Sequence, residues 1–299
     1  MSVIKPDQPL ALRVLRFPLT LLVLGFVAFS VLYLATAIIG GRPEILHRSP
    51  LQPLVILAGC ALTIWLYKLF QRRVELRDDV EFAFAGAGTE LAQGLGIGFA
   101  VFSAAALTAV LAGGMQIEGL RGGIGNLWGM LSMAIISGLF EELLFRGIAF
   151  RQLENLLGTW AALALTSAFF GLAHIGNPDA TWFAAFAIAV EAGILLGAAY
   201  MVTRRLWLAA GIHAAWNFTQ GWVFSVPVSG GDAPEGLLRT SFSGPVWLNG
   251  GAFGLEASVP ALVVATLAGL YLLRVGIIRH GLIAPLWQRK LGQTTGETE

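Results

Sequence analysis

Charged residues are scarce in this sequence. Aspartate, glutamate, lysine and arginine make up only 12% of its 299 residues, whereas an ordinary soluble domain carries about a quarter. Hydrophobic residues make up 56%, which is more apolar surface than a water-soluble fold can hide. The scarcity of charge therefore excludes an ordinary soluble protein.

Cysteine is almost absent. The single residue, Cys60, excludes an internal disulfide and any CxxC metal site, and its place inside an apolar run indicates plain packing. The net charge of +1 comes with no basic patch beyond the residues that flank apolar runs. We therefore expect no nucleic-acid partner.

Apolar runs of about 20 residues, enough to cross a bilayer core of about 30 Å, recur along the chain. They predict an all-α, polytopic membrane helix bundle with about eight transmembrane helices. The expected spans are residues 17–39, 51–69, 91–113, 126–150, 159–176, 181–202, 206–222 and 258–278. We divide the chain into N-terminal helices (1–122), a core of helices four to seven (123–222), and an outer loop, last helix and cytoplasmic tail (223–299).

The basic residues predict the orientation. Eight spans place both termini on one side of the membrane, and 15 of the 19 lysines and arginines then fall on that same side. Only Arg42, Arg48, Arg121 and Arg239 fall in the opposite loops. Because basic residues are enriched in cytoplasmic loops, the chain is predicted to be N-in and C-in.

Charged side chains inside a bilayer are costly, so each is a functional hypothesis. In residues 140–146, read as a helix, Glu142 and Arg146 are four residues apart and can form an ion pair. Glu141 lies about 100° around the helix and is less easily neutralised by that arginine. It is the better candidate for a general base, although a structural pair with a spare glutamate stays open.

Two further predicted helices carry histidine. If the fourth and fifth helices turn near residue 158, Glu141 and His174 each lie about 16 residues, or roughly 25 Å, from the turn and so at matching depth. His213 and Asn217 are four residues apart on one face of the seventh helix; a polar patch joining helices is the alternative. Glu191 could be a partner for a histidine, line a wet cavity or serve packing.

Three motifs in order on successive predicted helices resemble those of the CPBP intramembrane proteases, which include the type II CAAX prenyl endopeptidases. Glu141, Glu142 and Arg146 resemble the family's EExxxR motif. Phe170 and His174 resemble its FxxxH motif, and His213 and Asn217 resemble its HxxxN motif. The resemblance covers about residues 125–222. It implies an endopeptidase that hydrolyses peptide bonds of membrane-associated or CAAX-like substrates.

The resemblance also implies roles. Glu141 with His174 would activate a water, His213 and Asn217 would hold the oxyanion, and Glu142, Arg146 and Phe170 would support them. Glu141, His174 and His213 also make a plausible zinc set, although they lack the HExxH arrangement and can work without metal, which we favour. The expected partners are membrane lipids and a peptide or membrane-protein substrate, in a bacterial inner membrane.

Two other classes stay open. A non-catalytic scaffold or bacteriocin-immunity protein would have no chemical need for Glu141, and a proton-coupled carrier would make Glu191 indispensable. The protease hypothesis lets Glu191 be dispensable and makes a geometric prediction. Glu141, His174, His213 and Asn217 should converge on one cavity, which we expect to open toward the cytoplasm.

Overall fold

The structure, a computed structural model, describes residues 9–41, 49–78 and 80–289. Arg42 and Arg48, which entered the prediction of orientation, lie outside these residues. Each of the eight predicted spans contains a helix. The helices are α1 (Leu10–Leu15), α2 (Pro18–Gly41), α3 (Leu51–Phe70), α4 (Ala87–Leu111), α5 (Leu127–Ile136), α6 (Arg151–Leu157), α7 (Thr159–Ala173), α8 (Trp182–Thr203), α9 (Trp207–Phe218), α10 (Val246–Asn249) and α11 (Val259–His280).

Six helical stretches of the described chain are long and apolar enough to cross a membrane. They are Pro18–Gly40, Leu51–Glu75, Ala87–Leu111, Leu127–Leu157, Trp182–Thr203 and Val259–His280. Helix α7 is apolar but shorter, and α9 with the π-helical turn Thr219–Val223 covers the seventh predicted span. The helix bundle is as predicted, while eight crossings and the side of the termini stay predictions.

The fourth predicted span is a continuous helix, as expected, but it is not α-helical throughout. Between α5 and α6 the chain forms two π-helical segments, Ser137–Glu141 and Leu143–Phe150. Such wider turns are frequent at functional sites because they change the direction of side chains. The helix ends at Gly158, whose φ of 84° favours glycine and makes the predicted turn into α7.

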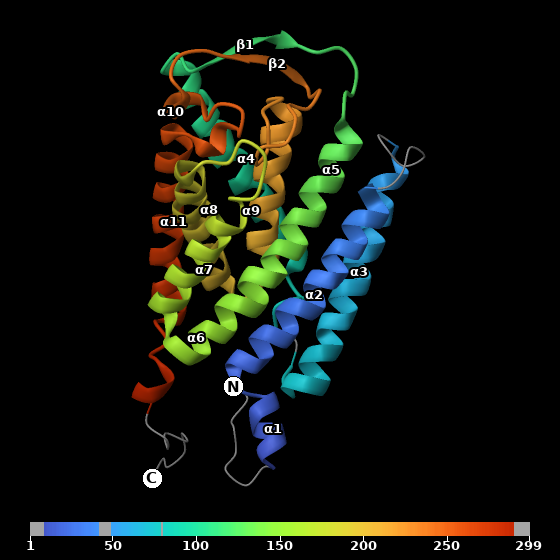
Figure 1. The fold of residues 1–299 in the computed structure, drawn as a ribbon, viewed down its shortest axis with the longest axis vertical. Helices are drawn as coiled ribbons and strands as arrows, with labels where there is room; N and C mark the ends of the chain where they lie inside the picture. The colour runs from blue at the N-terminus through green and yellow to red at the C-terminus, as the bar shows by residue number, and fades with distance from the viewer. Residues whose placement is uncertain (1–8, 42–48, 79, 290–299) are drawn as a thin grey trace.

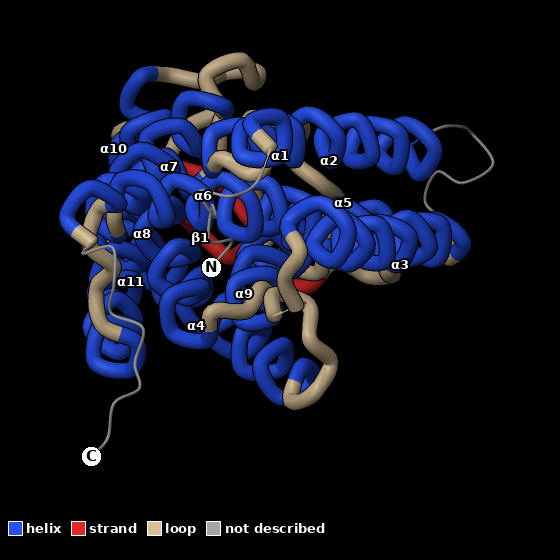
Figure 2. Tube along the Cα trace, turned by 90° about the horizontal axis from the view of Figure 1, so that it is seen from below, coloured by secondary structure: helices blue, strands red, loops and turns tan. Residues whose placement is uncertain are grey.

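The helices form two groups. Helices α2 and α3 pack on each other at one side of the bundle, and α11 lies at the opposite side against α8 (Figures 1 and 2). The helix from α5 to α6 crosses between them (Figure 1). Cys60 is buried in the contact between α3 and this helix, as expected for a packing residue.

Glycine lets α4 and α9 touch through their backbones. A Cβ added at Gly94 would meet the carbonyl oxygen of Leu208 and the Cα of Gly211, and one added at Gly98 would meet the carbonyl oxygen of Ile212. The Gly-rich stretch therefore serves helix packing. This contact positions α9, which carries His213 and Asn217.

A small sheet adds to the helical bundle. Strand β1 (Met115–Leu120) pairs antiparallel with β2 (Leu238–Phe242), with an irregularity between Ile117 and Gly119. The sheet lies across one end of the bundle, and the start of α2 and the end of α11 lie at the other end (Figure 1). The sequence did not predict it, because both strands are short and lie in loops.

Candidate active site

The structure brings the four predicted site residues together. Glu141, His174, His213 and Asn217, from three separate helical regions, all line one cavity of about 610 Å³. We call it the catalytic cavity. Glu141 and His174, on the two sides of the turn at Gly158, thus line the same cavity.

The catalytic cavity lies toward the end of the bundle that carries the sheet. Its lining continues into the loops after α7 and after α9, through Asn177, Pro178, Gly231 and Asp232. Both termini of the described bundle lie at the other end (Figure 1). Cytoplasmic termini and a cavity that opens toward the cytoplasm therefore cannot both hold, and the expectation that combined them was wrong.

Glu142 is the paired carboxylate of the site, through one of its two oxygens. It is completely buried, and its Oε1 accepts hydrogen bonds from Nη1 of Arg146 and Nδ1 of His213, each at 2.9 Å. Arg146 also donates to the carbonyl of Ala192 at 3.1 Å and lies 4.7 Å over the ring of Phe170. The predicted ion pair is present, and the same carboxylate also fixes His213.

Glu141 keeps its carboxylate toward the cavity. Its Oε1 accepts a long hydrogen bond of 3.4 Å from the hydroxyl of Tyr33, and its Oε2 lies 3.9 Å from Nε2 of His213. No arginine or lysine forms an ion pair with it among the described residues. With a side chain 17% exposed, Glu141 is the less neutralised of the two glutamates and is accessible to water.

The hydrogen bonds fix the orientation of both imidazoles. Nδ1 of His174 lies 2.8 Å from the carbonyl of Phe170, and because a carbonyl only accepts, this nitrogen carries a proton. Nδ1 of His213 donates to Glu142 by the same argument. In its neutral form each ring therefore offers Nε2 as an acceptor, and His213 donates from Nε2 only when it is protonated.

Asn217 is tied to the fourth span. Its Nδ2 donates to the hydroxyl of Ser137 at 2.9 Å, across 80 residues of sequence. This bond uses one of the two amide hydrogens and leaves the other available in the catalytic cavity.

Sequence reasoning missed Tyr33. This residue lies on α2, far from the three motifs, and stacks on Phe140 with 5.4 Å between ring centroids. Its hydroxyl inside an apolar run was the available signal, because a buried tyrosine oxygen needs a hydrogen-bond partner. Nothing in the sequence indicated which helix that partner belonged to.

The zinc set considered from sequence does not fit the geometry. Among the residues that the structure describes, no three His, Cys, Asp or Glu side chains are placed to hold a metal ion together. Glu141, His174 and His213 share a cavity without forming such a group.

Fold and site together define a class, an integral membrane protein of packed helices with a glutamate and two histidines around an internal cavity. Residues 123–219 match the family described as Type II CAAX prenyl endopeptidase Rce1-like. The chain therefore carries a domain of the CPBP family of intramembrane proteases, as the motifs predicted. Comparison with curated proteins and with solved structures gave no match.

Proposed function

We propose that the chain is an intramembrane endopeptidase in which Glu141 and His174 activate a water for attack on a peptide bond. The observation that carries this proposal is the contrast between the two adjacent glutamates. Oε1 of Glu142 is bonded to both Arg146 and His213 at 2.9 Å, whereas Glu141 faces the catalytic cavity with only distant partners. A general base needs such an accessible, unpaired carboxylate.

In the first step, Glu141 takes one proton from water and the hydroxide adds to the scissile carbonyl carbon. Nε2 of His174, the acceptor nitrogen of that ring, accepts a hydrogen bond from the same water and orients it. When the intermediate breaks down, Glu141 returns its proton to the leaving nitrogen, so that a carboxylic acid and an amine are formed and the glutamate is ionised again.

The oxyanion needs donors on the opposite side. Asn217 supplies its free amide hydrogen, and His213 supplies Nε2–H when it is protonated. Glu142 stabilises that imidazolium through Nδ1, as the aspartate does in a catalytic triad. Arg146 and Phe170 keep Glu142 in place by the contacts described above.

The substrate is proposed to be a membrane-associated or CAAX-like peptide or protein, and the location the plasma membrane of a bacterium. A cavity of about 610 Å³ accommodates a short peptide segment but not a folded domain. We propose residues 123–222 as the catalytic unit, since they supply every motif residue.

The test is cleavage of a membrane-peptide library by the purified protein in detergent. Wild type is compared with Glu141→Ala and His213→Ala, each with and without a zinc chelator, and with Glu118→Ala on exposed β1 as the matched control. We expect cleavage by wild type and the control and none by the two site variants. Cleavage that survives the loss of Glu141 would overturn the proposal, and would leave the scaffold and carrier hypotheses in its place.

A further inference from the structure

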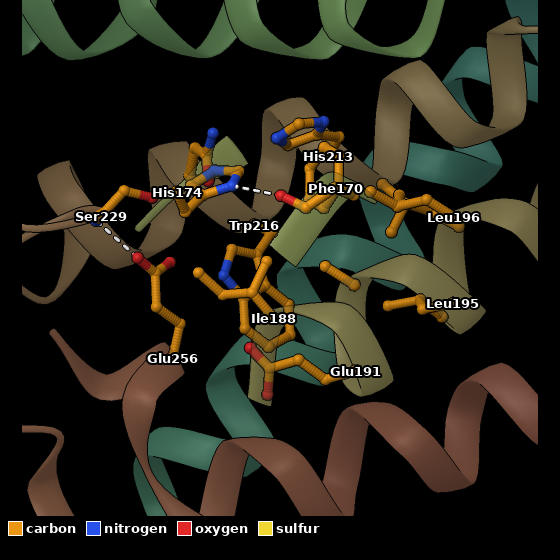
Figure 3. Close-up of a pocket in the computed structure, with 13 residues that line it drawn as sticks. Phe170, His174, Ile188, Glu191, Leu195, Leu196, His213, Trp216, Ser229 and Glu256 are labelled. Atoms are coloured by element: carbon orange, nitrogen blue, oxygen red, sulfur yellow. Dashed lines mark hydrogen bonds between the residues drawn. The ribbon is translucent and has the colours of Figure 1, made fainter. Parts of the chain in front are cut away.

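A second, smaller cavity lies behind the catalytic one. We call it the rear chamber; His174, His213 and Asn217 line both cavities, and Glu191 and Glu256 line only this one. Its volume of about 30 Å³ has room for one or two water molecules. Figure 3 shows the carboxyl group of Glu256 directed toward Ser229 and His174.

Both carboxyl groups of the rear chamber are buried without a cation. Glu191 is 1% exposed and its Oε2 has no hydrogen-bond partner, and Glu256 is 4% exposed and accepts the backbone N–H of Ser229 at 2.5 Å. No lysine or arginine forms an ion pair with either one within the described residues. A buried carboxylate without a cation is costly, so this arrangement needs an explanation.

The titratable groups facing the chamber come from every element around it. They are His174 after α7, Glu191 on α8, His213 on α9 and Glu256 on the short turn Leu255–Ala257. His213 is already bonded to Glu142, which leaves His174 as the nearby base that can balance a carboxylate; Glu256 interacts electrostatically with it. Burial also raises the pKa of the Glu256 carboxyl group.

Two like charges on one small chamber repel each other, and a single proton removes the repulsion. Of the two carboxyl groups, Glu256 has a backbone N–H that stabilises the ionised form, while Glu191 has an oxygen without any donor. The proton therefore belongs chiefly on Glu191, and the single remaining negative charge lies beside His174.

We propose that Glu191 and Glu256 share one proton across the rear chamber and that the single charge they keep makes Glu256 a positioning residue for His174. The charge acts electrostatically on the imidazole that orients the attacking water in the proposed mechanism. This role rests on the proposed protease function, whereas the shared proton does not. Glu256 lies outside the segment that matches the family, so the C-terminal part of the chain would contribute to the site.

Infrared spectroscopy of the purified protein tests the shared proton without any substrate. The carbonyl stretch of a neutral, buried carboxyl group is compared among wild type, Glu191→Gln, Glu256→Gln and the exposed control Glu118→Gln. We expect this band in wild type, in the control and in Glu256→Gln, and its loss in Glu191→Gln, because the remaining carboxyl group then ionises. A band that Glu191→Gln leaves unchanged overturns the proposal.

Cleavage kinetics test the effect on His174. Glu256→Gln, whose amide oxygen can still accept the Ser229 N–H, should lower kcat about tenfold with little change in KM, and Glu256→Asp should restore much of it. Glu191→Gln keeps the charge and should stay within about threefold of wild type. Equal kcat for wild type and Glu256→Gln overturns the positioning role. If wild type itself cleaves nothing, the protease proposal fails, and the infrared pattern still decides on the shared proton.

Discussion

Two buried clusters of glutamate and arginine differ in how completely their charges are paired. At the end away from the sheet, Glu75 is bonded to Arg77 and Arg151 at 2.5 Å each, and Glu81 is bonded to the same arginines at 2.8 and 3.4 Å. Every carboxylate there has two arginines. This cluster holds α3, α6 and the loop between α3 and α4 together.

The catalytic cluster has the same residue types in a different ratio. The two glutamates have one arginine nearby, Arg146, and it forms an ion pair with Glu142. Among the described residues, Glu141 has only Tyr33 and His213 as partners, at longer distances. We propose that the chemistry resides in the less completely paired carboxylate and that the balanced cluster serves stability. Substitutions in the two clusters should therefore differ in their effects on activity and on stability.

The largest effect is expected from the adjacent glutamates, replaced one at a time. Glu141→Gln removes the proposed general base and should lower kcat by at least about 100-fold, with thermal stability in detergent kept near that of wild type. Glu142→Gln should lose activity and also about 3 kcal/mol of stability, because Arg146 then lies buried without a carboxylate. Melting temperatures measure the stability of the two variants, and cleavage rates measure their activity. Equal stability of the two variants would contradict the difference in pairing between the two glutamates.

An intermediate effect is expected in the balanced cluster. Arg151→Met leaves Glu75 and Glu81 with one arginine, so the free energy of unfolding should fall by about 3 kcal/mol. The kcat of the molecules that remain folded should not change. Denaturant titration and active-site normalised rates check this, with exposed Arg274→Met as the control. A fall in kcat at full stability would show that this end of the bundle takes part in catalysis.

The smallest effect is expected from Tyr33→Phe. The substitution keeps the stacking on Phe140 and removes one long hydrogen bond to Glu141, which is worth about 1 kcal/mol. We expect kcat to fall by roughly three- to tenfold with stability unchanged, and Tyr271→Phe on the exposed face of α11 to have no effect. A loss as large as that of Glu141→Gln would make Tyr33 a direct participant in the reaction.

Much of the fold could be predicted from local pattern. Apolar runs marked every long helix, because a spanning helix must be apolar along its length. The Glu142–Arg146 ion pair followed from helical spacing. The shared cavity of Glu141 and His174 followed from their equal distances to the turn at Gly158. Each of these inferences needs only residues that are close in sequence or joined by a single hairpin.

The rest depends on contacts that spacing does not encode. Tyr33 reaches Glu141 across 108 residues, and Glu256 faces His174 from beyond the family segment. The π-helical turns were hidden, because their sequence does not distinguish them from a regular helix. The direction of the cavity was mistaken, because the sequence does not show that the loops after α7 and α9 continue its lining.

The glycine contact between α4 and α9 sets a limit on how this protein can be divided. Where two main chains touch, no change of side-chain conformation can compensate for the loss of one partner. A fragment that began at residue 123 would contain every motif residue, yet the glycine face of α9 would have nothing to rest on. The stretch that matches the family is therefore shorter than the stretch that supplies the packing of α9.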